Sequence, residues 1–184
     1  MRPMVGLSLL LIALALMAAG CRKLDLFRRA EPACARANGP SVGTPAPEID
    51  GETFDGQHLK LSDHRGKVVV VVFWYSGCMP CLEMIPHERE LAERHRDKPF
   101  ALLGVNVDVN LNAARKTIAS KKMTWPIWQP DAESPIDRVW DVSLLPAIFV
   151  IDPDGIVRHA NVRGRALDEA VEKLLAETET AKSR

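Results

Sequence analysis

Two cysteines that follow an uninterrupted apolar run limit what this chain can fold into more than any other feature. The run extends from Val68 to Trp74, and the cysteines are Cys78 and Cys81. A run without polar alternation predicts a strand that is buried on both faces in the middle of a sheet. Residues three apart on a helix share a face, and Pro80 suits a first helical turn, where a missing N–H costs nothing. The junction therefore predicts a strand, a turn and a helix that brings two thiols together as a redox-active dithiol.

Two structural roles for the cysteine pair have less support. A structural zinc site usually takes four cysteine or histidine ligands, but Cys21 and Cys34 lie far upstream of the pair. The histidines are scattered, with none at a short ligand spacing from another: His58, His64, His87, His95 and His159. A purely structural disulfide between residues three apart would close a loop too short to constrain the unfolded chain much. Both roles remain alternatives to redox chemistry.

The length of the chain limits the number of domains, and its charge limits the kinds of partner it can attract. A chain of 184 residues allows one ordinary domain together with a targeting segment and a linker. The 47% hydrophobic content is sufficient for a core. Lys and Arg together number 24, as do Asp and Glu, so no global charge attracts the chain to nucleic acid or to an acidic surface. Nucleic-acid binding is therefore unsupported.

The first residues predict export. An apolar run from Val5 to Ala19 leads into small residues and then Cys21, an arrangement that resembles a bacterial lipoprotein signal. The run is short for a membrane-spanning helix, which needs about 20 residues. We expect a signal peptide over residues 1–20 and lipidation of Cys21, which would hold the chain at the periplasmic face of a bacterial membrane. An uncleaved signal anchor is the alternative, although Arg22 and Lys23 behind the run make its orientation awkward.

Residues 21–47 are predicted to be a lipid-anchored, flexible tether. The segment from Arg22 to Pro47 carries mixed charge, several prolines and glycines, and no sustained hydrophobic period. Cys34 lies within it, as a free thiol or as one half of an intermolecular bridge. In an oxidising compartment an accessible dithiol becomes a disulfide unless something reduces it, so a reducing function requires a partner.

Residues 48–177 are predicted to form the folded domain, followed by a polar tail over residues 178–184. The first half is expected to contain a hairpin over Phe54–Leu61 with an Asp55-Gly56 turn, the buried strand, a helix over Pro80–Arg96, a strand over Phe100–Val107 and a helix over Asn112–Lys122. A strand, a crossover helix and a second strand in this order predict a parallel pair.

The second half predicts a short segment over Trp125–Trp128, a brief helix over Ile136–Trp140, a strand over Pro146–Asp152, a turn over Asp152–Gly155, an antiparallel segment over Ile156–Val162 and a helix over Ala166–Glu177. Trp125, Trp128 and Trp140 are interpreted as core or loop packing, because aromatic residues at scattered spacing usually have that role.

With these elements in this order, the chain resembles thioredoxin-fold proteins of the TlpA/ResA-like, AhpC/TSA-related group. The resemblance covers roughly residues 41–175, and its specific parts are the stretch Phe73–Cys81, Pro86, the region of Asp108 and the Leu145-Pro146 pair. It implies an α/β thioredoxin fold with a central mixed, mostly parallel sheet flanked by helices, and with an N-terminal β-hairpin.

The resemblance also implies roles for individual residues. Cys78 would attack a substrate disulfide and Cys81 would resolve the intermediate. Pro146 would be a cis-proline lying against the dithiol, where it obstructs metal capture, although a trans proline at the start of a strand is the alternative. Leu145 would offer backbone groups to substrate, and Trp74 would shape a substrate surface. No cofactor and no metal are implied.

The sequence departs from the group where a proton would be handled. Val72 stands where thioredoxins have a buried Asp, and Met84 stands where ResA-like proteins have a Glu. Glu83 is adjacent, but it lies about 200° around the helix from Cys81, so we expect it to face solvent. Deprotonation of Cys81 would then rely on water.

His87 and Glu88 come next on the same predicted helix, and both are interpreted as part of a solvated face rather than as catalytic groups.

The favoured hypothesis is an exported, membrane-anchored thiol-disulfide oxidoreductase that reduces other exported proteins and receives electrons from a transmembrane thiol reductase. The resemblance suggests apocytochrome c cysteines or metal-site thiols as substrates. One alternative is a peroxiredoxin-like thiol peroxidase, against which Tyr75 stands where peroxiredoxins carry a Thr. The other alternative is a module that binds a soft metal such as Cu(I) through two thiolates.

Overall fold

The structure, a computed structural model, describes residues 38–129 and 136–182. Their centre is a five-stranded sheet. Its strands are β3 (Val68–Trp74), β4 (Phe100–Asn106), β5 (Ile127–Trp128), β6 (Ala147–Ile151) and β7 (Val157–Ala160). The helices are α2 (Met79–Arg94), α3 (Leu111–Lys121), α4 (Ile136–Val139) and α5 (Arg165–Lys182), with a 3-10 turn η1 (Leu61–His64). Strands β1 (Asp50–Glu52) and β2 (His58–Lys60) form a separate antiparallel pair.

The central sheet has the strand order β5-β4-β3-β6-β7. Strand β3 pairs in parallel with β4 and antiparallel with β6, so Val70 lies opposite Leu102 on one side and Val150 on the other. The predicted mixed sheet is confirmed, and its parallel and antiparallel strand pairs are equal in number among the described residues. Because β3 and β4 are parallel, their carboxyl ends meet at one edge of the sheet, where α2 begins.

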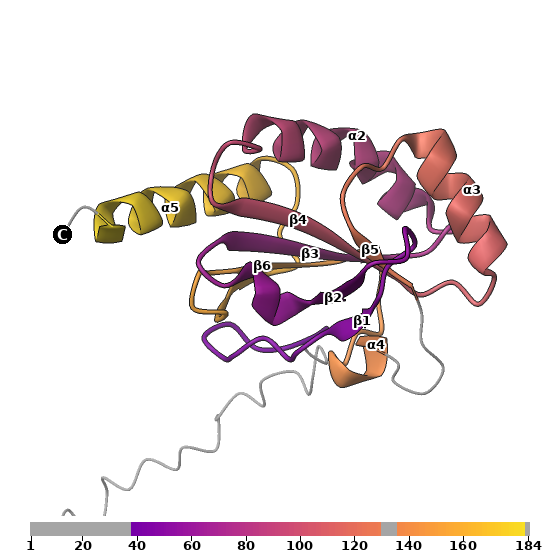
Figure 1. Cartoon of the computed structure of the whole chain (residues 1–184), viewed down its shortest axis with the longest axis horizontal. Coiled ribbons are helices and arrows are strands. Elements are labelled where there is room, and N and C mark those ends of the chain that lie inside the picture. The colour runs from indigo at the N-terminus through magenta and orange to yellow at the C-terminus, as the bar shows by residue number, and fades with distance from the viewer. Residues whose placement is uncertain (1–37, 130–135, 183–184) are drawn as a thin grey trace, which may run out of the picture. The chain divides into compact units, whose positions relative to one another are not determined.

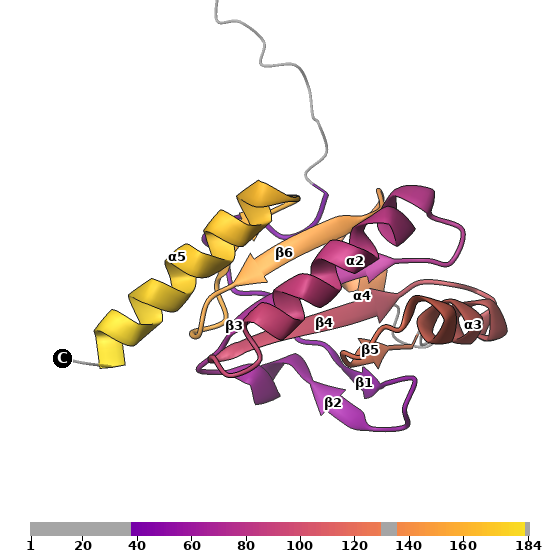
Figure 2. The ribbon, with the colours of Figure 1, turned by 90° about the horizontal axis from the view of Figure 1, so that it is seen from above.

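Strand β3 is buried on both faces, as its uninterrupted apolar run predicts, since none of its residues is more than 3% exposed. One face packs against α2 and α5 through Val68, Val70, Val72 and Trp74. The other face packs into a second core through Val69, Val71 and Phe73. Figure 1 shows α2 and α5 on one side of the sheet and α4 with the β1–β2 pair on the other, and Figure 2 shows α2 lying over the strands, with α5 beside the end of β6.

The tryptophans predicted to pack in the interior do so. Trp125 lies in the core under α2 and α5, whereas Trp128 and Trp140 lie in the core on the opposite face. The ring of Trp140 is 5.1 Å from that of Phe149 and 5.4 Å from that of Phe73, centroid to centroid. These aromatic contacts fasten α4 to the middle of the sheet.

Element boundaries differ from the predicted ones mainly at the ends of helices. Helix α2 ends at Arg94 instead of Arg96, and α5 continues to Lys182 instead of stopping near Glu177. The Asp55-Gly56 turn lies between β1 and β2, as predicted, but the first strand of this hairpin precedes Thr53 instead of following it. Gly56 has a positive φ of 80°, which a glycine adopts without strain.

Residues 38–47 are bound to the domain, although the sequence predicts little structure there. The N–H of Gly43 donates to the Val157 carbonyl at 2.7 Å, and the Val157 N–H donates to the Thr44 carbonyl at 2.9 Å. Pro45 forms an isolated antiparallel bridge with Ile156, so this segment continues the sheet beyond β7. The predicted signal peptide, Cys21 and Cys34 lie outside the described residues. Among the described helices, none has the length and apolar character needed to cross a membrane.

Candidate active site

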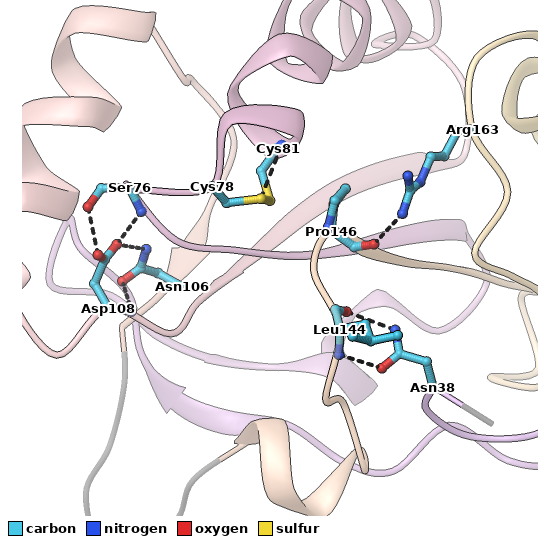
Figure 3. Close-up of a disulfide and its surroundings, with 9 residues drawn as sticks. All are labelled: Asn38, Ser76, Cys78, Cys81, Asn106, Asp108, Leu144, Pro146 and Arg163. Atoms are coloured by element: carbon cyan, nitrogen blue, oxygen red, sulfur yellow. Dashed lines mark hydrogen bonds between the residues drawn. A yellow bond between two sulfur atoms is a disulfide. The ribbon is translucent and has the colours of Figure 1, made fainter. Parts of the chain in front are cut away.

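Cys78 and Cys81 form a disulfide at the start of α2, as Figure 3 shows. Cys78 is the N-cap residue, and its Sγ accepts a hydrogen bond from the backbone N–H of Cys81 at 3.2 Å. Their Cα atoms are 5.2 Å apart, and Pro80 lies in the first turn. Both cysteines are largely buried, with 5% of Cys78 and 3% of Cys81 exposed. The structure thus brings the two predicted catalytic residues together at the positive end of a helix dipole.

An open hollow of about 470 Å³ adjoins the disulfide. Its lining comes from the β3–α2 turn and from the loop before β6: Tyr75, Gly77, Cys78, Met79, Pro80, Ser143, Leu144 and Leu145. Tyr75, Met79 and Leu144 leave 40%, 63% and 70% of their surface exposed. Large apolar side chains exposed together commonly mark an interaction surface.

The loop before β6 contains Leu145 and Pro146, two of the three predicted substrate-binding residues. The Leu145–Pro146 peptide bond is cis, as the resemblance implies. The Pro146 carbonyl accepts a hydrogen bond from Nη2 of Arg163 at 2.8 Å. By contrast, the main-chain N–H and carbonyl of Leu145 take part in no hydrogen bond to the described part of the chain. Figure 3 places this loop on one side of the disulfide.

A buried carboxylate on the other side of the disulfide holds the turn between β3 and α2. Asp108 accepts hydrogen bonds from the Ser76 backbone N–H at 2.8 Å and from the Ser76 hydroxyl at 2.6 Å. It also accepts one from Nδ2 of Asn106 at 2.7 Å. The sequence did not predict a role for Ser76 or Asn106. The parallel pairing of β3 with β4 could have indicated one, because it brings the carboxyl ends of both strands to the same edge of the sheet. The network fixes the backbone two residues before Cys78.

Comparison with known proteins decides the family. The sequence model of the AhpC/TSA family matches residues 42–160. The chain belongs to the AhpC/TSA family. It is 30% identical over 135 residues to the thiol-disulfide oxidoreductase ResA of Geobacillus kaustophilus (strain HTA426), an alignment that covers 73% of this chain and 76% of the relative.

Solved structures have the same fold. The thioredoxin domain of a thiol-disulfide oxidoreductase from Bacteroides vulgatus superposes with a TM-score of 0.71 at 28% identity, covering 74% of this chain and 99% of that domain. A putative thiol:disulfide interchange protein DsbE from Chlorobium tepidum gives 0.65 at 29% identity, covering 75% and 97%. The predicted thioredoxin fold and TlpA/ResA-like resemblance are confirmed, and the enzyme is a thiol-disulfide oxidoreductase.

Trp74 occupies a different place in this oxidoreductase from the predicted substrate surface. Only 2% of it is exposed, and it packs in the core under α2 and α5. It is the last residue of β3, which is buried on both faces, while the next residue, Tyr75, lines the hollow beside the disulfide. The exposed aromatic side chain beside the disulfide is therefore Tyr75, not Trp74.

Helix α2 of the oxidoreductase buries an acidic group that the sequence analysis assigned to solvent. Glu83 is exposed, as predicted, but Glu88 is only 2% exposed. Burial raises the pKa of Glu88 from 4.5 to about 8. His87 is also partly covered, and its Nε2 lies 3.0 Å from Oδ1 of Asp168 on α5. Glu88 follows Cys81 by seven residues, or two helical turns, so the helical period places both on the buried face.

Proposed function

We propose that this oxidoreductase reduces disulfides in other exported proteins through Cys78 and Cys81. The observation that carries the proposal is a disulfide at a helix N-terminus that lines a hollow without charged side chains. In the reduced enzyme, the Cys78 thiolate attacks one sulfur of the substrate disulfide and displaces the other as a thiolate. Cys81 then attacks the Cys78 sulfur of the mixed disulfide, which releases the second substrate thiol and leaves the Cys78–Cys81 disulfide.

Two features support Cys78 as the attacking residue. It occupies the N-cap position, where the helix dipole contributes about 0.3–1 kcal/mol to an anion. The Cys81 N–H also points at its sulfur, and a hydrogen bond to the charged form lowers a thiol pKa. Cys81 lies about one turn further along the helix, within disulfide distance of Cys78, so it is suited to an attack within the molecule.

The surroundings of the dithiol support a protein substrate. Tyr75, Met79 and Leu144 form an exposed apolar surface, which favours contact with an unfolded or extended segment. The unpaired main chain of Leu145 provides one donor and one acceptor that an extended segment can pair with. Apocytochrome c cysteines and metal-site thiols remain the proposed substrates.

Each turnover leaves the enzyme oxidised, so the proposal includes an electron donor. A transmembrane thiol reductase would return the Cys78–Cys81 disulfide to the dithiol. Lipidation of Cys21 would hold the enzyme at the periplasmic face of the membrane, near such a donor.

Trapping the intermediate tests this mechanism. The full-length Cys81→Ser chain, incubated with insulin as a protein disulfide, should accumulate a mixed disulfide that dithiothreitol releases. The Cys78→Ser chain is the matched control and should trap none. Trapping by the Cys78→Ser chain alone would reverse the assigned roles, and trapping by neither would contradict the proposal.

The reduction potential of the wild-type pair tests the direction of electron flow. We expect a value at or below about −250 mV, on thioredoxin's side of the scale. A value near about −120 mV, as in DsbA, would make the enzyme an oxidant instead. If no reversible disulfide forms, a soft-metal site becomes the leading alternative, and consumption of peroxide would favour the peroxidase.

A further inference from the structure

The geometry points to Asn38 as a positioning residue for protein substrates. Its side chain binds the loop that ends in Leu145-Pro146, and we infer that this binding holds the loop in the shape that receives an extended substrate segment. The inference rests on the proposed function, because it takes Leu145 as the place where substrate pairs. It adds a residue that lies outside the matched family region of residues 42–160.

The Asn38 side chain makes three hydrogen bonds to two adjacent loop residues. Its Oδ1 accepts from the backbone N–H groups of Ser143 at 2.8 Å and of Leu144 at 3.0 Å. Its Nδ2 donates to the Leu144 carbonyl at 2.8 Å. One amide thus satisfies both main-chain groups of Leu144, as Figure 3 shows. The contact joins residues more than 100 positions apart in the chain, since 106 positions separate Asn38 from Leu144.

Asn38 is itself held in place by contacts on both sides of its own backbone. Nδ2 of Asn161 donates to the Asn38 carbonyl at 3.2 Å, and the Gly39 N–H donates to the Asp141 carbonyl at 3.1 Å. Gly39 has a φ of +103°, and a Cβ at this position would overlap the ring of Phe149. Only glycine lets the chain pass this close to the core, so the position of Asn38 is closely defined.

These bonds divide the loop into occupied and available main-chain groups. Asn38 forms hydrogen bonds with the main-chain N–H and carbonyl of Leu144, and Arg163 donates one to the Pro146 carbonyl. Leu145 between them has no hydrogen bond to the described residues. The exposed Leu144 side chain, which lines the hollow at the dithiol, is mounted on the backbone that Asn38 holds. Removal of the Asn38 amide would free this backbone to turn and would misplace both Leu144 and Leu145.

The test compares a protein disulfide with a small one, because only the protein needs the loop. Full-length wild-type, Asn38→Ala and Asn38→Asp chains are reduced, purified in detergent and mixed with insulin or with hydroxyethyl disulfide. Acid quench and alkylation then give second-order rate constants. We expect Asn38→Ala to slow the reaction with insulin about tenfold, the equivalent of one or two hydrogen bonds, and the reaction with hydroxyethyl disulfide less than about twofold.

The variants separate positioning from a merely structural role. Asn38→Asp keeps the Oδ1 acceptor for the N–H groups of Ser143 and Leu144 but loses the Nδ2 donor, so its rate with insulin should fall between those of wild type and Asn38→Ala. Asn112→Ala is the matched control: this residue is exposed, and its side chain makes no hydrogen bond to the described residues. It should react as wild type does with both disulfides.

The outcomes distinguish this inference from the proposed function. Wild type that reduces neither disulfide contradicts the proposed function, and the inference falls with it. Active wild type with an unchanged Asn38→Ala rate for insulin overturns the inference alone. Equal slowing by Asn38→Ala with both disulfides also overturns it, because the effect would then lie in the dithiol or the fold.

Discussion

Glu88 is buried on the same face of α2 as Cys81. Burial raises the pKa of Glu88 to about 8, so the carboxyl group is protonated in the folded protein at neutral pH. In the unfolded chain the same group ionises near its ordinary value of 4.5. The folded state therefore binds one proton more between these values, and the free energy of unfolding falls as the pH rises through this window. Above about pH 8 the loss is complete.

Replacing Glu88 with Gln should remove this loss. We expect Glu88→Gln to be more stable than wild type by up to about 5 kcal/mol at pH 8.5, because each unit of pKa difference between the folded and unfolded states is worth about 1.4 kcal/mol. At about pH 3 the two should differ little, since Glu88 is then largely protonated in both the folded and the unfolded state. Urea unfolding at both pH values checks the prediction, with the exposed Glu83→Gln as control. A stability difference that does not change with pH would contradict the assigned pKa.

Prediction from sequence succeeds for residues whose role depends on their immediate neighbours along the chain. The strand–turn–helix junction contains its own signals, so Cys78, Cys81 and the bounds of β3 are all found without a structure. Glu88 is predicted to face solvent because it is charged, although the helical period places it on the buried face of α2. The roles of Ser76 and Asn38 depend on partners 32 and 106 positions away, and no local pattern reports such pairings.

Residues 38–47, which precede β1, also have contacts that the local sequence does not predict. Their prolines and glycines indicate a tether, and they give no hydrophobic period. In the structure, backbone groups of these residues form hydrogen bonds with β7 and with the β6–β7 turn. Gly39 and Gly43 both have positive φ, so glycine composition here reflects a specific path of the chain and not only freedom of movement.

The two glycines of this segment allow a matched test of its packing. Gly39→Ala should lower the free energy of unfolding by about 2–4 kcal/mol, because the added methyl group meets both an unfavourable φ and the Phe149 ring. Gly43→Ala has a similar φ of +88° with no atom within 4 Å of its Cβ, so about 1 kcal/mol is expected. Urea denaturation midpoints measure both. Equal losses would show that the segment does not pack against Phe149 in solution.

At the scale of the whole molecule, electrostatics should have little influence on the reaction. The chain has a formal net charge of zero, and the described lining of the hollow at the dithiol contains no charged side chain. Salt changes association rates chiefly when charged surfaces steer the partners together.

We therefore expect the rate constant with neutral hydroxyethyl disulfide to change less than about twofold between about 20 mM and 500 mM sodium chloride. Stopped mixing followed by alkylation gives this constant, and insulin provides the comparison for a charged protein. A steep decline with salt for the neutral disulfide would mean that a charged group takes part at the dithiol.

The contacts of Asn38 and Gly39 with the domain also determine where the chain can be truncated without losing them. The family region begins at residue 42, and a truncated protein cut there would retain the whole sheet, the helices and both cysteines. It would lack Asn38 and Gly39, and with them the bonds to Leu144 and Asp141. Such a fragment would report the chemistry of the dithiol but not its selectivity. If Asn38 positions the loop as inferred, the region matched by the family model is smaller than the unit that recognises a substrate.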